Sequence, residues 1–283
     1  MFSKVSYTWQ LMGASWQVLK QDRKMLIFPL LSFVCCVAVL ASFALPIILT
    51  DSWHPPGGEA TAGAQVAYYG VLFLFYLCTY FVVTFFNAAL IACAVKRMQG
   101  GDPTVGDGLR AATARLPLIV GWAFLAATVG LVLRIIEDRS EKVGRLVAGL
   151  LGIAWSLATF LAVPVLVLEG KGPVAALKES SSLLKQTWGE QVIGGFSFGV
   201  LFFLLALPGV ALVLIGFVLG PTAGWVVGGL AAAAGALYLL IAGLVQSAME
   251  GIFRAALYLY ARERRAPGAF GRDMLSSAMQ PRG

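Results

Sequence analysis

Catalytic and metal-binding side chains are scarce in this chain of 283 residues. Only 12% of its residues are charged, it has one histidine, and its four cysteines form no C-x-x-C motif. The histidine, His54, has no serine, cysteine or carboxylate at a spacing typical of a catalytic group. Motifs for P-loop nucleotide binding, dinucleotide binding and zinc proteolysis are absent as well. We therefore expect a protein that is not an enzyme and that has no cofactor and no metal site.

Long apolar runs dominate the chain instead. Each of six runs exceeds the roughly 18 apolar residues that mark a membrane-spanning helix. The runs cover residues 25–49, 66–95, 117–136, 146–168, 191–218 and 224–253. The sequence predicts an all-α integral membrane protein with six transmembrane helices in a single membrane domain, residues 1–283. Because Cys35, Cys36, Cys78 and Cys93 fall inside these runs, we interpret them as small packing residues.

Basic residues are distributed unevenly over the two sides of the predicted membrane domain. One side, which includes both chain ends, holds 17 of the 21 Lys and Arg residues and 9 of the 14 Asp and Glu residues. The other side holds 4 basic and 5 acidic residues. Cytoplasmic loops carry the excess of Lys and Arg, so we place the N- and C-termini in the cytoplasm. The net charge of +7 then indicates attraction to anionic inner-leaflet lipids rather than to nucleic acid.

Amphipathic helices on the cytoplasmic membrane surface are predicted ahead of the first and fifth runs, because apolar residues recur there at alternating spacings of three and four. The first stripe is Phe2, Val5, Trp9, Met12, Trp16 and Leu19, and the second is Val174, Leu177, Ser181, Leu184 and Trp188. Shorter helices are predicted after Pro103 and Pro267. We interpret the chain as a threefold internal repeat with units at about 2–96, 103–169 and 173–262, followed by a short cytoplasmic tail at 263–283.

Glycine and proline indicate where helices approach or bend within the bilayer. Four glycines near a tight connection are spaced four apart: Gly216, Gly220, Gly224 and Gly228. Such spacing allows close helix contact, and two interpretations stay open: packing within one hairpin, or packing between copies of the chain. Three prolines inside the runs are predicted to kink or end helices: Pro46, Pro164 and Pro208.

A small polar group is predicted inside the bilayer. Gln246, Glu250 and Arg254 are spaced four apart, which places them on one face of the last helix. In the repeat alignment, Asn87 occupies the position of Arg254. Polar groups at this depth are costly and often functional, so they are candidates for binding an ion or a head group. The alternative is a structural clamp in which Arg254 reaches the lipid phosphates.

The stretch PVLVLEGKGPVAALKESSSLLKQTWGE at 164–190 resembles the signature of uncharacterised bacterial polytopic membrane families. The segment WQVLKQDRKMLIFPLLS near the start is similar to the N-terminus of one such family, a domain of unknown function. A looser likeness extends to the membrane domains attached to some glycerophosphodiester phosphodiesterases. The resemblance implies a bacterial inner-membrane protein of unknown activity. It transfers no catalytic residue, because the phosphodiesterase domain is missing from this sequence.

Two functions are consistent with these patterns. The first is a non-enzymatic multi-pass protein whose basic cytoplasmic collar contacts anionic lipids, a partner protein or a second copy of the chain. The expected contact residues are Trp9, Trp16, Lys20, Arg23, Lys24, Lys185 and Trp188. The alternative is a transporter or channel for a small or lipid-like solute, with Asn87, Gln246, Glu250 and Arg254 along its path.

Overall fold

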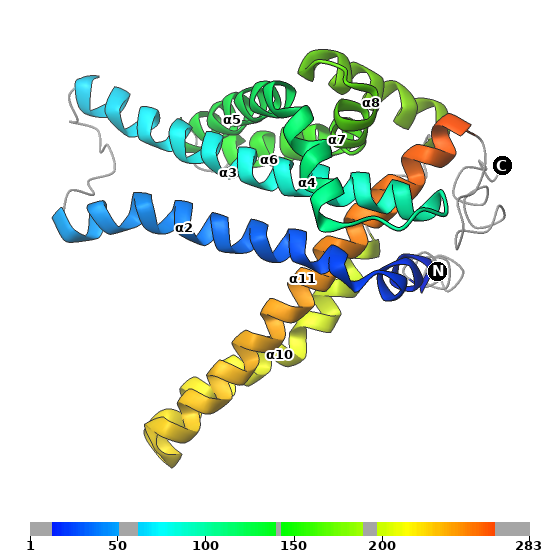
Figure 1. Ribbon diagram of the computed structural model, residues 1–283. Helices are drawn as coiled ribbons and strands as arrows, with labels where there is room; N and C mark the ends of the chain where they lie inside the picture. Colours follow the sequence, from blue (N-terminus) through cyan, green and yellow to red (C-terminus); the bar gives the residue numbers. More distant parts are fainter. Residues whose placement is uncertain (1–12, 51–61, 140–142, 189–196, 264–283) are drawn as a thin grey trace, which may run out of the picture. The chain divides into compact units, whose positions relative to one another are not determined.

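The computed structural model describes residues 13–50, 62–139, 143–188 and 197–263 of the chain. Every regular element in these ranges is a helix (Figure 1). Five helices are long and apolar enough to cross a membrane, and a bent pair of helices makes a sixth when the pair counts as one span. This confirms the prediction of an all-α chain with several helices of membrane-spanning length, and the predicted number of six is reached when the bent pair counts as one span.

The long helices follow the predicted apolar runs closely. They are α2 (Ile27–Thr50), α3 (Ala62–Met98), α5 (Leu116–Arg139), α10 (Ser197–Ala223) and α11 (Trp225–Glu263). Cations in their last turns, such as Lys96 and Arg97 on α3, suit the negative end of the helix dipole. Pro46 and Pro208 lie inside α2 and α10, and neither proline ends its helix.

The fourth apolar run forms a broken helix rather than a continuous one. Its first part is α6 (Val143–Ala158), and its second part consists of α7 (Ala162–Pro164) and the π-helix η2 (Val165–Glu169). The two parts are bent by 42° at residues 159–161. Pro164 explains the position of the break, because it has no N–H to donate to the carbonyl of residue 160 and its ring crowds that carbonyl. The predicted kink is therefore present, about one turn before the proline.

Short helices precede three of the long ones. They are helix 13–21 with the 3-10 turn η1 (Arg23–Leu26), α4 (Val105–Ala114) and α8 (Pro173–Trp188). On α8 the buried residues are Ala176, Ser180 and Leu183, whereas Val174 is 57% exposed. The predicted apolar stripe of α8 therefore lies beside the packed face of this helix and does not coincide with it.

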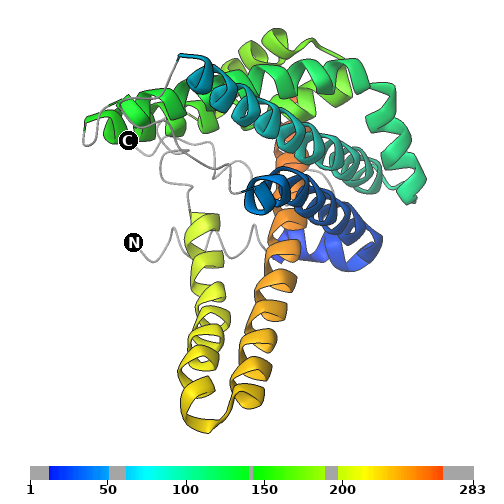
Figure 2. The ribbon, with the colours of Figure 1, turned by 90° about the vertical axis from the view of Figure 1, so that its left-hand side faces the viewer.

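The chain divides into two compact units, and the first comprises residues 27–187. α3 is central in this unit, because α2, α4, α5, α7 and η2 all pack against it, while α6 packs against α5 (Figures 1 and 2). Aromatic pairs occupy these contacts. Phe73 of α3 lies edge-to-face with Phe124 of α5, and Trp122 of α5 is stacked on Trp155 of α6 with ring centroids 6.1 Å apart.

The second unit comprises residues 1–26 and 188–283, and its main described feature is the hairpin of α10 and α11. The two helices run side by side in opposite directions (Figures 1 and 2). A Cβ on Gly228 would lie 2.5 Å from the Gly216 carbonyl oxygen and 2.6 Å from the Gly220 nitrogen. These glycines therefore bring the two backbones together within one hairpin. Gly224, with φ +99°, forms the turn between the helices.

Candidate functional site

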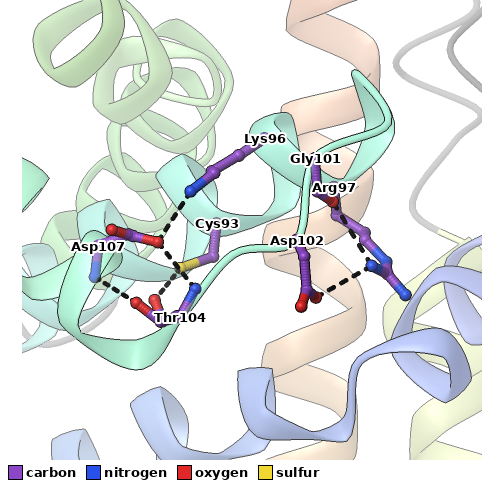
Figure 3. A network of polar contacts seen from close by, with 7 residues as sticks. All are labelled: Cys93, Lys96, Arg97, Gly101, Asp102, Thr104 and Asp107. Carbon is purple, nitrogen blue, oxygen red and sulfur yellow. Dashed lines mark hydrogen bonds and ion pairs between the residues drawn. The ribbon is translucent and has the colours of Figure 1, made fainter.

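Polar contacts link the end of α3 to the start of α4, and we call residues 93–107 the first junction (Figure 3). Thr104 and Asp107 form a capping box at the start of α4. Thr104 Oγ1 accepts a hydrogen bond from the Asp107 N–H at 3.2 Å, and Asp107 Oδ2 accepts one from the Thr104 N–H at 2.9 Å. Lys96 Nζ lies 2.9 Å from the same carboxylate oxygen. The first turn of α4 is thus joined to the last turns of α3.

The Asp107 carboxylate is stabilised in its charged form. The hydrogen bond from Lys96 holds the pKa of Asp107 well below its usual range, and the hydrogen bonds from Thr104 lower the pKa further. The contact is solvent-exposed, so the ion pair itself adds little to stability. Its consequence is electrostatic, because the charge of Asp107 is neutralised within the fold.

Arg97 closes the turn that follows α3. Gly100 has a φ of +88°, which is the left-handed conformation that glycine favours at helix ends. Arg97 Nη1 donates to the Gly101 carbonyl oxygen at 3.4 Å and lies 3.3 Å from Asp102 Oδ1. On α3, the buried thiol of Cys93 donates to the Thr104 carbonyl oxygen at 3.4 Å (Figure 3). The first junction thus pairs each of its two acidic side chains with a base.

A similar turn connects η2 to α8, and we call residues 167–173 the second junction. Gly170 has a φ of +67° and ends η2. Lys171 Nζ lies 2.9 Å from Glu169 Oε2 and 3.0 Å from Glu179 Oε2. The hydrogen bond with Glu169, followed by that with Glu179, raises the pKa of Lys171. Both junctions share a Gly-x-x-Pro order, GGDP at 100–103 and GKGP at 170–173, with a left-handed glycine in the first position.

Arg115, between α4 and α5, joins the surface helix to the second junction. Its Nε donates to the Val167 carbonyl oxygen at 3.2 Å, although the two residues are 52 positions apart. Its guanidinium group occupies the space in which a side chain on Gly170 would lie, since a Cβ there would be 2.8 Å from Nη1. A cation is favourable beside the unpaired carbonyls at the end of a helix. Arg115 is half-buried in this position.

α8 supplies hydroxyl groups to the break in the fourth apolar run. Ser180 is completely buried, and its Oγ accepts a hydrogen bond from the Leu161 N–H at 3.0 Å. The Ser181 hydroxyl donates to the Leu177 carbonyl oxygen at 2.9 Å and approaches the Ala158 carbonyl oxygen at 3.5 Å. Irregular backbone at membrane depth requires such partners. These contacts fix α8 against the broken helix.

We expect the Ser180→Ala variant to be less stable by about 1–3 kcal/mol, because the buried Leu161 N–H loses its acceptor. Ser181→Ala is the matched control, since its hydroxyl donates mainly to a carbonyl of its own helix and its loss should cost less than about 0.5 kcal/mol. Thermal unfolding in nanodiscs measures both variants. Equal melting temperatures for the two variants would show that Ser180 does not stabilise the break.

The described collar residues are placed at the surface of the fold. Trp16 is 41% exposed, and Lys20 Nζ lies 5.4 Å from the centroid of its ring. Arg23, Lys24 and Lys185 are exposed too. Leu19, which shares the predicted stripe with Trp16, is instead buried. Trp9 and the side chain of Trp188 lie outside the described residues, as does the helix predicted after Pro267.

The predicted intramembrane residues divide between the two units. On α11, Gln246 Nε2 donates to Glu250 Oε1 at 3.0 Å, and Arg254 lies 3.6 Å from Glu250 Oε2. Both carboxylate oxygens of Glu250 therefore have partners on their own helix. Asn87 is half-buried on α3, in the other unit. Among the described residues, no three His, Cys, Asp or Glu side chains are grouped as metal ligands.

Most residues that build the junctions are not among those predicted from the sequence. Local signals were present, because the first glycines of GGDP and GKGP and the spacing of Thr104 and Asp107 are typical of helix caps. Arg115 had no sequence signal, because its partner Val167 is distant along the chain.

Comparison with known proteins places the chain in one family. Residues 66–268, which include both junctions, match the family of unknown function DUF6159. No curated protein matches the chain. The match covers more than half of the sequence and agrees with the expected resemblance to an uncharacterised family. The chain therefore belongs to the family of unknown function DUF6159.

Proposed function

We propose that this protein is a non-enzymatic multi-pass protein of the bacterial inner membrane, which binds anionic lipid headgroups through the basic surface helices at its cytoplasmic face. The observation that carries the proposal is a difference between acidic and basic side chains in whether they have partners within the fold. In the surface helices and junctions, the acidic side chains have partners inside the fold, whereas most exposed bases do not.

The acidic residues of these segments are all engaged in the described part of the chain. Asp22 is buried and accepts a hydrogen bond from the Lys24 N–H at 3.2 Å. Asp102 and Asp107 pair with Arg97 and Lys96, and Glu169 and Glu179 share Lys171. Three bases thus compensate three of these five carboxylates, and the two remaining negative charges are fewer than the exposed bases of the same segments.

Six exposed bases in the same segments have no acidic partner among the described residues. They are Lys20, Arg23 and Lys24 beside helix 13–21, Arg110 on α4, and Lys178 and Lys185 on α8. Each basic residue near an anionic leaflet contributes about 1 kcal/mol to membrane attraction. Trp16, which carries Lys20 over its ring, adds the kind of amphipathic side chain that favours the interface.

The position of these bases at the ends of apolar helices supports a role at the headgroup level. Lys24 is in the turn that leads into α2, and Arg110 lies shortly before α5. Lys178 and Lys185 are on α8, which begins four residues after the end of the apolar η2. The excess of Lys and Arg on this side of the predicted domain indicates the cytoplasmic leaflet, where anionic lipids concentrate.

The transport alternative has weaker support from the described residues. Glu250, the acidic residue of the predicted path, is held by Gln246 and Arg254 on its own helix. The broken fourth run, a feature that transporters often use for binding, has its freed Leu161 N–H occupied by Ser180. Both observations favour a structural role for these polar groups.

The test compares charge removal on the two predicted sides of the membrane. We expect the triple variants K20Q/R23Q/K24Q and R110Q/K178Q/K185Q each to bind phosphatidylglycerol at least about tenfold more weakly, given about 1 kcal/mol per base. Binding is measured by native mass spectrometry of delipidated protein titrated with phosphatidylglycerol or phosphatidylcholine.

The matched control is R139Q/K142Q/R145Q, which removes three positive charges from the predicted outer side. It should retain phosphatidylglycerol binding, because the distribution of Lys and Arg predicts these residues on the opposite side of the membrane from the collar. If the outer triple variant weakens binding as much as the inner ones, the attraction reflects net charge and the proposal fails. Unchanged binding in both inner variants would also contradict it, and would direct attention to a protein partner.

A further inference from the structure

The Arg115 side chain contacts the backbone of the second junction at two points. Its Nε donates to the Val167 carbonyl oxygen at 3.2 Å, and its guanidinium group lies against Gly170. Gly170 has a φ of +67°, a backbone conformation that favours glycine. Its lack of a side chain also leaves room for the guanidinium group, because a Cβ there would lie 2.9 Å from Arg115 Cζ. The position of the guanidinium plane is therefore fixed by the backbone of η2 and its turn.

The terminal nitrogens of this guanidinium are unused. Among the described residues, neither Nη atom of Arg115 has a hydrogen-bond or ion-pair partner. An arginine whose two terminal nitrogens remain available presents a planar pair of donors that matches two oxygens of a carboxylate or a phosphate. A pre-positioned arginine of this kind loses little rotamer freedom when an anion binds.

At the first junction, an arginine next to a left-handed glycine pairs with a carboxylate. There Arg97 lies beside the left-handed Gly100 turn, and Asp102 supplies a carboxylate oxygen to it at 3.3 Å. When GGDP is aligned with GKGP, the residue in the position of Asp102 is Gly172. A Cβ on Gly172 would have no atom within 4 Å, so the space beside it is open. The second junction thus has no carboxylate in the position that corresponds to Asp102.

The two nearby carboxylates, Glu169 and Glu179, pair with Lys171 rather than with Arg115. Their repulsion of an anion is therefore reduced. Glu169 and Glu179 both lie within 3.0 Å of Lys171 Nζ, which offsets part of their charge. Arg115 directly precedes α5, and Gly170 directly follows η2, so both residues are at the edge of apolar helices. Lipid phosphates are found at this depth.

We propose that Arg115 binds a phosphate group at the second junction, beside Gly170. The phosphate belongs either to an anionic lipid headgroup or to a free phosphate compound in the cytoplasm. The inference rests on the proposed function in its lipid form and names one specific site within the collar.

The test uses Arg115→Gln to remove the donors and Gly172→Asp to supply an internal carboxylate. We expect each variant to bind its tightest phosphatidylglycerol at least about tenfold more weakly, measured by native mass spectrometry. The Gly172→Asp variant keeps Arg115 and should melt in phosphatidylcholine nanodiscs at the wild-type temperature or above. Gly106→Asp is the matched control, because it adds the same charge at an exposed glycine of α4 and should retain the bound lipid.

Two probes distinguish the source of the phosphate. Displacement of the tight phosphatidylglycerol by millimolar inorganic phosphate supports a site for free phosphate compounds, and resistance to displacement supports a headgroup site. If Arg115→Gln unfolds the protein, lipid binding by Gly172→Asp tests the proposal by itself. Tight binding that persists in Gly172→Asp, or that is lost equally in Gly106→Asp, overturns the proposal.

The collar variants separate this site from the broader function. The inner triple variants lower binding of many lipids, whereas Gly172→Asp removes one. Loss of the single tight lipid without any effect of the triple variants would sustain the Arg115 site and reject the collar.

Discussion

Replacing Gly228 by alanine is expected to destabilise the α10–α11 hairpin by about 1–3 kcal/mol, the usual cost of overpacking. The new methyl group would lie 2.5 Å from the Gly216 carbonyl oxygen, 2.6 Å from the Gly220 nitrogen and 2.7 Å from the Gly220 Cα. All three atoms belong to the backbone of α10, so no side-chain rotation relieves the clash. The two helices must move apart, and lipid cannot replace the lost contact with equal packing.

The next residue along α11 provides the control. Gly229 has no atom within 4 Å of its Cβ position, so Gly229→Ala adds a methyl group that meets nothing. Alanine is the better helix former by about 0.5–1 kcal/mol, and this variant should be as stable as the wild type or more stable. Thermal unfolding in nanodiscs compares the two variants. A Gly228→Ala protein as stable as Gly229→Ala would show that the glycines do not set the helix separation.

The contacts of Gly228 also bear on the two interpretations that the sequence left open, which are packing within one hairpin and packing between copies of the chain. The spacing of Gly216, Gly220 and Gly228 in multiples of four is compatible with contact inside one hairpin and with contact between copies. The atoms that these glycines face belong to the same hairpin. Spacing alone cannot decide such a question, because it identifies a close contact without identifying the partner.

Composition was sufficient to predict the long helices, because an apolar run of membrane-spanning length has few alternatives to a helix. The run at 146–168 is the instructive exception. Its composition gave no sign of the break at 159–161, and Pro164 indicated only a kink or an end. The break depends also on Ser180, whose hydroxyl stabilises the free Leu161 N–H from another helix. Such tertiary support is not visible in a hydropathy pattern.

The candidate site was predicted unevenly for a related reason. Lys20, Arg23, Lys24 and Lys185 were found because surface bases beside apolar runs follow the rules of membrane topology. Arg115 was not predicted, because its contacts are with Val167 and Gly170, which are distant in the sequence and come close to it only in the folded chain. Its importance therefore comes from a tertiary contact and from the absence of a carboxylate at Gly172.

The surface helix α4 is docked tightly enough to be a rigid part of the collar, and this docking depends on one glycine. Gly108 is buried where α4 crosses α3. A Cβ at this position would lie 2.7 Å from the Ala89 carbonyl oxygen, 2.7 Å from Cys93 Sγ and 2.6 Å from Phe28 Cζ. The Lys96–Asp107 ion pair of the first junction is exposed and contributes little, so we expect this close approach to be a main determinant of the docking.

Gly108→Ala is therefore expected to lift α4 from α3 and to cost about 1–3 kcal/mol of stability. The separation should also expose Cys93, whose side chain is now buried beneath α4. In a background in which Cys35, Cys36 and Cys78 are replaced by serine, maleimide labelling of Cys93 should accelerate by about 5- to 150-fold, because the free energy of opening falls by about 1–3 kcal/mol. Gly106→Ala, whose Cβ would meet only Thr104 Oγ1 at 3.7 Å, should label as slowly as the parent. Slow labelling in both variants would mean that Gly108 does not control the docking of α4.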